Sequence, residues 1–210
     1  MKAGSVKKKT QARGRARRDI LLTAARALLD RQPIDKITLP MISEEANIPA
    51  SSTYNLFQDV HELWCELGRN ISDEMAVIVP DASASDCWQA SIRSYLSAFM
   101  EFFNTDAAAR QLMLGPATSL DIRMAACHDD LRFGTLLYKS LNAAYHLPEI
   151  NNPEQVFLWA ISIADVFFTH AVIENGRITP PVLEEAGLAA TAYLEKYIPT
   201  IVKRRSPMIG

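Results

Sequence analysis

The sequence predicts an all-α protein with a small N-terminal domain and a larger C-terminal helical domain. Two observations favour this class. Apolar residues recur at intervals of three and four through most of the 210 residues, and no stretch alternates at the period of a strand. Proline, glycine and asparagine divide this pattern into helix-length pieces. The composition, 49% hydrophobic and 22% charged, is that of a globular chain and excludes a fibrous or wholly disordered protein.

The first 18 residues differ from the rest of the chain in charge. They carry eight Lys or Arg side chains and no acid, whereas the chain as a whole has 22 basic and 24 acidic side chains. Because like charges repel one another and cannot be buried, we expect residues 1–18 to form a disordered basic arm. Such an arm can bind a polyanion through Arg15, Arg17 and Arg18. A solubilising tail is the alternative.

Four helices are expected between residues 19 and 79. Apolar side chains at positions 21, 24, 25, 28 and 29 predict a first helix that ends before Pro33. Two short helices follow, at 38–46 and at about 49–56. A longer helix then runs from Val60 toward Val79. We assign residues 19–67 to the N-terminal domain.

The second and third helices have the layout of a helix-turn-helix. They meet at Asn47, and asparagine is among the few residues besides glycine that accept the left-handed conformation. We expect the two helices to pack crosswise through Ile42, Ala46, Ile48 and Tyr54. The start of the third helix then presents short polar side chains, the type that contacts base edges and phosphates in the major groove of DNA.

Residues 15–67 resemble the DNA-binding domain of the tetracycline-repressor (TetR) family of transcriptional regulators. The matching residues occur in the family's order and include its Tyr-x-x-Phe spacing: Ile20, Ala24, Ala25, Thr38, Ile42, Ala46, Ile48, Tyr54, Phe57, Glu62 and Leu63. The resemblance implies a three-helix DNA-binding domain, followed by a helical domain that dimerises and encloses a small-molecule effector. It also implies DNA contacts at Thr38, Ala50, Ser51, Ser52, Tyr54 and Asn55.

Two residues depart from the family pattern, and the charge of this domain is unusual. Val60 stands where the family has a lysine, and Asn47 stands where it has a glycine. Residues 19–67 hold three basic and eight acidic side chains, although Lys and Arg supply much of the affinity for DNA. Our hypothesis is that residues 1–18 supply the missing positive charge, along the DNA backbone or in the minor groove.

Residues 68–210 are expected to form the effector-binding and dimerisation domain. Turn residues divide the chain after Pro80 into five expected helices, at about 86–104, 106–114, 119–146, 153–175 and 181–202. The stretch 156–173 is strongly apolar but contains four polar residues, so we expect a buried helix and no membrane span. We expect the last two helices to form a homodimer interface. A wholly internal core is the alternative.

Large apolar side chains and a few polar ones on these helices are candidates for an effector pocket. They are Trp88, Tyr95, Phe99, Met113, Met124, His128, Trp159 and Asp165. Their character indicates an apolar or aromatic effector, and ordinary core packing is the competing interpretation. Asp165 lies within an apolar run, where a carboxylate is costly unless it is paired.

Other function classes find little support. The three cysteines share no zinc-ligand spacing, and Cys127 beside His128 lacks a third ligand, so we expect no metal, no cofactor and a reducing cytoplasm. We find no nucleotide-binding or hydrolase motif and expect no enzyme. The sequence thus predicts a repressor that an effector releases from a near-palindromic operator. The alternatives are a small-molecule-binding protein or enzyme on the same fold that has lost specific DNA binding, and a protein-interaction module.

Overall fold

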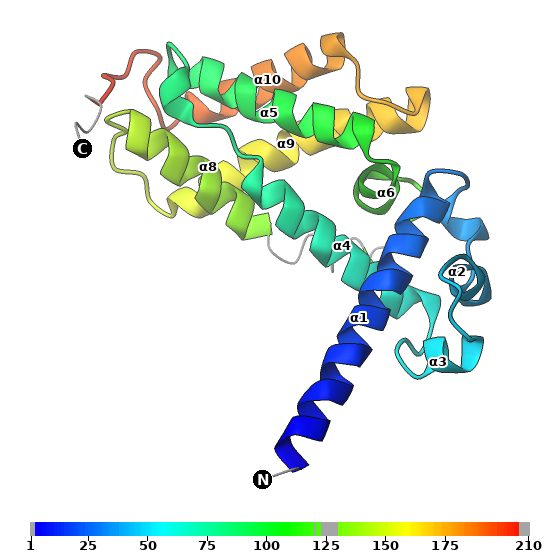
Figure 1. Ribbon diagram of the computed structural model, residues 1–210. Coiled ribbons are helices and arrows are strands. Elements are labelled where there is room, and N and C mark those ends of the chain that lie inside the picture. The colour runs from blue at the N-terminus through cyan, green and yellow to red at the C-terminus, as the bar shows by residue number, and fades with distance from the viewer. Residues whose placement is uncertain (1–2, 120, 123–129, 206–210) are drawn as a thin grey trace.

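The computed structural model describes residues 3–119, 121–122 and 130–205 (Figure 1). Within these ranges every regular element is helical, apart from one isolated β-bridge between Tyr145 and Arg204. An N-terminal group of helices packs on the start of a long helix, α4 (Val60–Val77), and α4 leads into a bundle of C-terminal helices. The predicted all-α fold class is confirmed.

The N-terminal group contains the predicted helix-turn-helix. Its elements are α1 (Ala3–Leu29), a 3-10 turn η1 (Ile34–Lys36), α2 (Leu39–Glu45) and α3 (Ala50–Tyr54). The expectation of a disordered arm differs from the structure, in which α1 begins at Ala3. The first turns of α1 project beyond α3, away from the rest of the protein (Figure 1). Alanine, lysine, arginine and glutamine are good helix formers, so the anchored helix from Asp19 onward extends backward through the basic residues.

In its described residues the C-terminal part contains four long helices and several short elements. α5 (Trp88–Thr105), α9 (Pro153–Asn175) and α10 (Pro180–Leu194) lie close to their expected bounds at the N-terminal ends. Between α5 and α8 (Asp130–Ala144) stand α6 (Ala107–Ala109) and a π-helical turn, η3 (Arg110–Leu114). A 3-10 turn, η2 (Ala82–Ala84), precedes α5. Of the expected helix at 119–146, residues 121–122 and 130–144 are helical among the residues that the structure describes.

The last expected helix ends earlier than predicted. α10 stops at Leu194, and the chain then turns so that Ile198 is fully buried. The backbone oxygen of Pro199 accepts a 2.9 Å hydrogen bond from Nε1 of Trp88. The segment beyond it follows the end of α8, where His146 N donates to Lys203 O at 2.8 Å. These tertiary contacts hold residues 195–205 against the bundle in an irregular conformation.

α9 is the central helix of the bundle and contacts both α8 and α10 (Figure 1). Gly134 of α8 allows the closest approach, because a Cβ atom there would lie 2.3 Å from the backbone oxygen of Glu154. By length and composition α9 could cross a membrane, but only about a third of its most apolar stretch is buried by its own chain. We interpret α9 as a core helix with a second apolar face left exposed.

Candidate nucleic-acid interface and its link to the helical domain

The turn between α2 and α3 has the predicted left-handed residue. Asn47 has φ of 51°, and the flanking backbone bonds close the turn, from Ala46 N to Ile42 O at 2.9 Å and from Ile48 N to Ser43 O at 2.9 Å. The packing prediction was wrong at one position. Tyr54 is 53% exposed, and its neighbour Thr53 is the fully buried residue of α3. One residue is about 100° around a helix, so Thr53 faces the core while Tyr54 faces outward.

The residues expected to contact DNA lie mostly at the surface of the helix-turn-helix. Ala50, Ser51 and Asn55 are exposed together with Tyr54. Ser52 is half-buried. Thr38, the N-cap residue of α2, is also exposed, and its side chain makes no capping bond. Its hydroxyl is therefore not used by its own helix and can donate to a phosphate.

The three arginines expected to contact DNA divide into two groups. Arg15 and Arg17 are exposed on the projecting part of α1 and form no ion pair within the described part of the chain. Arg18 instead points into the domain. Its Nη1 donates to Leu56 O at 2.8 Å, its Nη2 lies 2.5 Å from Glu66 Oε2, and its guanidinium carbon lies 4.3 Å from the ring centroid of Phe57.

Arg18 therefore has a structural role within the domain, which its neighbours Arg15 and Arg17 do not share. Hydrogen bonding to Glu66 raises the pKa of the guanidinium, and Glu62 adds to the effect. The side chain joins α1 to the end of α3 and to α4. The sequence predicted the same role for Arg18 as for Arg15 and Arg17. Only the packing of α4 against α1 shows which of these arginines turns inward.

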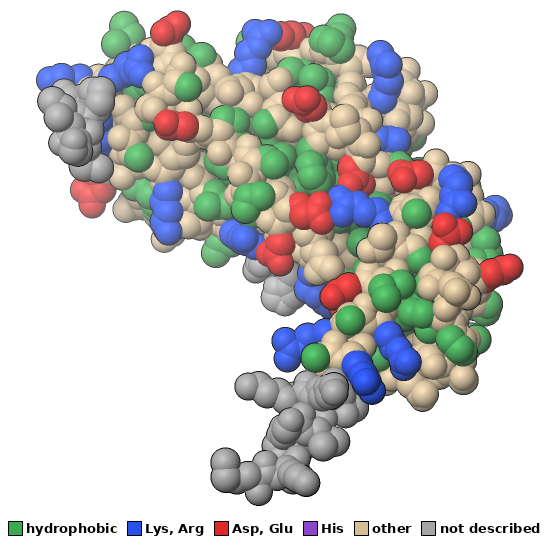
Figure 2. All heavy atoms as spheres, viewed as in Figure 1, with side chains coloured by type: hydrophobic (Ala, Val, Ile, Leu, Met, Phe, Trp, Pro, Cys, Tyr) green, Lys and Arg blue, Asp and Glu red, His purple; other side chains and the backbone are tan. Residues whose placement is uncertain are grey.

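Much of the domain's negative charge is used inside the protein. Glu62 and Glu66 face Arg18, and Glu45 pairs with Arg31 at 2.6 Å. Asp59 accepts a 2.8 Å bond from Glu62 N and so caps α4. In Figure 2, Lys and Arg side chains gather where α1 leaves the body of the protein. The net charge of residues 19–67 thus overstates the repulsion that DNA would meet.

Arg26 links the N-terminal group to the C-terminal helices. Its two Nη atoms donate to the two carboxylate oxygens of Glu74 on α4, each at 2.7 Å. Its Nε donates to Asp106 at 3.0 Å, and Asp106 also caps α6 by accepting from Ala109 N at 2.7 Å. Hydrogen bonding to Glu74 raises the pKa of this guanidinium despite its partial burial. A single side chain therefore joins α1, α4 and the α5–α6 junction.

Gln111 makes the second link, from the π-helical turn to the end of α1. Its Nε2 donates to Leu29 O at 2.7 Å and to Gln32 O at 3.1 Å, while its Oε1 accepts from Ile34 N at 2.8 Å. π-helical turns are rare and occur often at functional sites. Gly115 is required beside it, because a Cβ atom there would lie 2.3 Å from Gln111 O. Nothing in the sequence distinguished Gln111 or Arg26 from ordinary surface residues.

Among the described residues, those expected to line an effector pocket differ in their burial. Trp88, Tyr95, Phe99 and Met113 are buried, and an aromatic cluster joins Tyr95 to Phe99 with ring centroids 4.5 Å apart. Trp159 is 54% exposed on α9, and Asp165 is exposed as well. Two further candidates, Met124 and His128, lie outside the described residues.

Tyr95 is the candidate with the most unusual environment. Its hydroxyl is buried and has no hydrogen-bond partner among the described residues. Burial raises the pKa of this hydroxyl, and the negative charge of Asp165 raises it further. Asp165 therefore lies near enough to act on Tyr95 although its own side chain is exposed.

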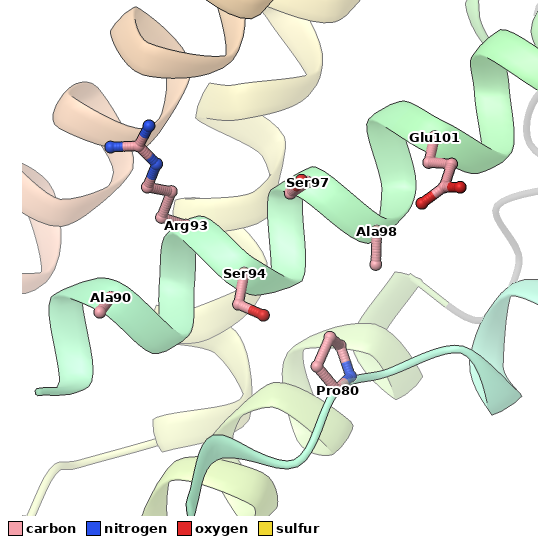
Figure 3. A pocket seen from close by; sticks show the side chains of 7 residues that line it. All are labelled: Pro80, Ala90, Arg93, Ser94, Ser97, Ala98 and Glu101. Atoms are coloured by element: carbon pink, nitrogen blue, oxygen red, sulfur yellow. The ribbon is translucent and has the colours of Figure 1, made fainter. Parts of the chain in front are cut away.

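A shallow groove of about 430 Å³ lies along α5, and none of the described candidates lines it. Figure 3 shows small side chains following one side of the helix, with Pro80 opposite them. Arg93 at the edge of the groove pairs with Glu184 of α10. The lining residues are Pro80, Ala90, Arg93, Ser94, Ser97, Ala98 and Glu101.

Among known proteins, this chain matches solved structures but no family profile and no curated sequence. A TetR-family transcriptional regulator from Streptomyces coelicolor matches with a TM-score of 0.67 and 19% identity, over 87% of this chain and 99% of that chain. This chain has the TetR-regulator fold.

Two other structures with the TetR-regulator fold carry functional descriptions. RolR in complex with resorcinol matches with a TM-score of 0.61 and 14% identity, over 89% of this chain and 90% of that one. SmeT, the repressor of the Stenotrophomonas maltophilia multidrug efflux pump SmeDEF, matches with a TM-score of 0.59 and 18% identity, over 89% and 93%. The shared fold places α2 and α3 of this chain as its helix-turn-helix.

Proposed function

We propose that the protein is a cytoplasmic, sequence-specific DNA-binding transcriptional regulator, a repressor that binds a near-palindromic operator as a homodimer and is released by a small apolar or aromatic effector. One observation carries the proposal. Ser51, Tyr54 and Asn55 are exposed on α3, and Thr38 at the start of α2 in the same helix-turn-helix is exposed and makes no side-chain capping bond. A helix that presents short polar side chains in this way fits the major groove.

The basic extension of α1 supports the same function. Arg13, Arg15 and Arg17 are exposed and form no ion pair within the described part of the chain. Free guanidinium groups next to a helix-turn-helix can neutralise phosphates and release their counterions. The extension also makes up for Val60, which provides no charge at the start of α4.

The apolar face of α9 supports a homodimer. Trp159, Val166 and Ile173 are each more than half exposed and recur every seven residues, so they lie along one side of the helix. Leu188 of the adjacent α10 is 64% exposed. Monomeric proteins rarely leave such a stripe in water, and a second copy of the chain would cover it.

The buried hydroxyl of Tyr95 supports an effector site in the C-terminal domain. A buried polar group without a partner costs free energy, so a ligand atom that accepts its hydrogen bond would stabilise the domain. The ring of Tyr95 contacts Phe99, which in turn contacts Phe133, and this aromatic cluster suits an aromatic ligand, as the resorcinol complex of RolR illustrates for another protein of this fold.

The DNA-binding part is tested by fluorescence anisotropy of the full-length protein with DNA from its own upstream region, at several salt concentrations. We expect tight binding that random DNA does not compete away and that weakens steeply with salt. Changing Arg13, Arg15 and Arg17 to glutamine together should lower the slope of log affinity against log salt by about 3 per protomer, if each side chain contacts a phosphate.

The matched control removes three exposed basic side chains of the C-terminal domain, Lys139, Arg177 and Lys203. It changes the net charge equally and should leave the slope close to that of the unaltered protein. Equal effects of the two triple variants would refute a role for the α1 extension. Competition by random DNA at the same concentration as the upstream DNA would refute sequence-specific regulation.

The homodimer is tested by light scattering after size-exclusion chromatography. The protein should elute at twice its monomer mass of 23.4 kDa. Trp159→Glu places a charge on the exposed stripe of α9 and should yield monomers, whereas Leu131→Glu on α8, at an exposed position outside the stripe, should not. A monomeric unaltered protein, or a dimer unaffected by Trp159→Glu, would contradict this interface.

A further inference from the structure

A second hollow lies where the helix-turn-helix domain meets the C-terminal helices. Its volume is about 250 Å³. Pro33 and Ile34, from the segment between α1 and α2, form one side. The residues 115–117 after the π-helical turn, together with Val172 near the end of α9, form the other. Both domains therefore contribute walls to this hollow. Its lining includes none of the described residues that were expected to form the effector pocket, although Gln111 and Gly115 lie two positions from Met113 in the sequence.

The walls of this hollow are almost wholly apolar. The one amide side chain, that of Gln111, already uses its Nε2 for Leu29 O and its Oε1 for Ile34 N. Arg110 directs its guanidinium to Phe103 O, at 2.6 Å. The polar ends of these two side chains are thus engaged with backbone atoms, and their apolar parts face the hollow. A ligand there finds carbon and few hydrogen-bonding groups.

The volume limits the ligand to a small molecule. An apolar cavity of about 150 Å³ in another protein holds benzene, and drug-sized pockets begin at about 300 Å³. A hollow between these sizes fits a single aromatic ring with a short alkyl or halogen substituent. A charged ligand would lose its hydration without finding a partner, so the ligand is uncharged.

We propose that this interdomain hollow binds an uncharged monocyclic aromatic molecule, at a site separate from the surroundings of Tyr95. The ligand would touch Ile34 on one domain and Ala117 and Val172 on the other. Gln111 already ties the same two segments together with three hydrogen bonds. Occupancy therefore fixes the spacing between the start of the helix-turn-helix and the π-helical turn.

If the ligand fixes the spacing between the domains, ligand binding is coupled to DNA binding. This coupling rests on the proposed function, but the binding of the ligand itself does not. DNA that prefers one domain spacing must change the affinity for the aromatic ligand by the same factor by which the ligand changes the affinity for DNA. A ligand that touches both domains can distinguish the two spacings, because its contacts differ between them.

The test is a titration of the full-length protein with fluorobenzene, followed by fluorine NMR and by nuclear Overhauser effects from ring protons to methyl groups. We expect saturable binding, with contacts from the ring to the methyl groups of Ile34 and Val172. Ala117→Phe fills the hollow from its exposed rim and should weaken binding about tenfold or more. Ala143→Phe, at an exposed position on α8, is the matched control and should bind as the unaltered protein does.

Two results would overturn this site. One is the lack of saturable binding up to about 10 mM fluorobenzene. The other is binding that survives Ala117→Phe and shows contacts to the rings near Tyr95, which would assign the ligand to the core and leave the proposed function intact. Conversely, contacts to Ile34 in a protein that binds all DNA equally would support this site and refute the proposed function.

Discussion

Replacing Gln111 with alanine should loosen the junction between the two domains. The substitution removes three hydrogen bonds, of 2.7, 3.1 and 2.8 Å, and leaves Leu29 O, Gln32 O and Ile34 N without this partner. At about 1 kcal/mol each, the loss amounts to about 3 kcal/mol. Water reaches the half-exposed segment around Gln32 and replaces part of this, so we expect a destabilisation of about 2 kcal/mol.

The expected loss converts to a measurable shift in melting temperature. For a chain of this size, 2 kcal/mol corresponds to about 4–8 °C. Circular dichroism at a fixed protein concentration measures the shift, and hydrogen exchange followed by mass spectrometry locates it. The amide of Ile34 should exchange faster, because its acceptor is the removed Oε1 of Gln111.

Gln89→Ala is the matched control for this prediction. Gln89 also lies on the helical domain, and its side-chain Nε2 donates a single hydrogen bond among the described residues, to Thr200 O at 2.9 Å. We expect it to lower the free energy of unfolding by about 0.5 kcal/mol or less. The reasoning would be refuted if the Gln111→Ala and Gln89→Ala proteins had the same melting temperature and the Ile34 amide stayed protected from exchange in Gln111→Ala.

Three further predictions follow from the contacts of single residues. Arg18→Ala should lower the free energy of unfolding, measured in urea, by about 2 kcal/mol, because it leaves Glu66 without its cation. Arg17→Ala should keep full stability and weaken DNA binding. The reverse pattern would exchange the roles of the two arginines. Gly134→Ala should lower the melting temperature, because the new Cβ atom would collide with the backbone of α9. Gly187→Ala places a Cβ atom where nothing lies within 4 Å and should raise the free energy of unfolding by up to about 1 kcal/mol. Equal effects of the two variants would contradict the close approach of α8 to α9. Tyr95→Phe removes a buried hydroxyl without a partner among the described residues and should leave stability unchanged or raise it by about 1 kcal/mol, as thermal melting would show; a clear loss would mean that the hydroxyl is bonded.

The helical elements could largely be predicted from the sequence. The three-to-four-residue period and the turn residues located α2, α3, α4, α5 and α9, and the left-handed turn at Asn47 was confirmed. These features depend on neighbours within a few positions of the chain, which is the range over which helix periodicity and backbone preference act. The short polar face of α3 belongs to the same class of local signal.

The roles of the charged residues were decided by tertiary structure. Composition treated Arg15, Arg17 and Arg18 alike, and only the packing of α4 against α1 turns Arg18 inward to Glu66. The same holds for the acidic side chains, several of which neutralise arginines far away in the chain. A sum over the sequence cannot distinguish an internal ion pair from a charge that faces solvent, because the two differ only in where the partner lies.

The sequence by itself determined the all-α class, the helix-turn-helix and the basic character of the N-terminal residues, since each follows from the order of neighbouring side chains. Tertiary structure alone decided which residues join the two domains. Arg26 and Gln111 find their partners 48 to 82 positions away along the chain, at distances that folding sets. The hollow between Ile34 and Val172 also exists only because those segments meet. Local pattern fixes the helices, and the contacts between helices create the sites where the domains can influence one another.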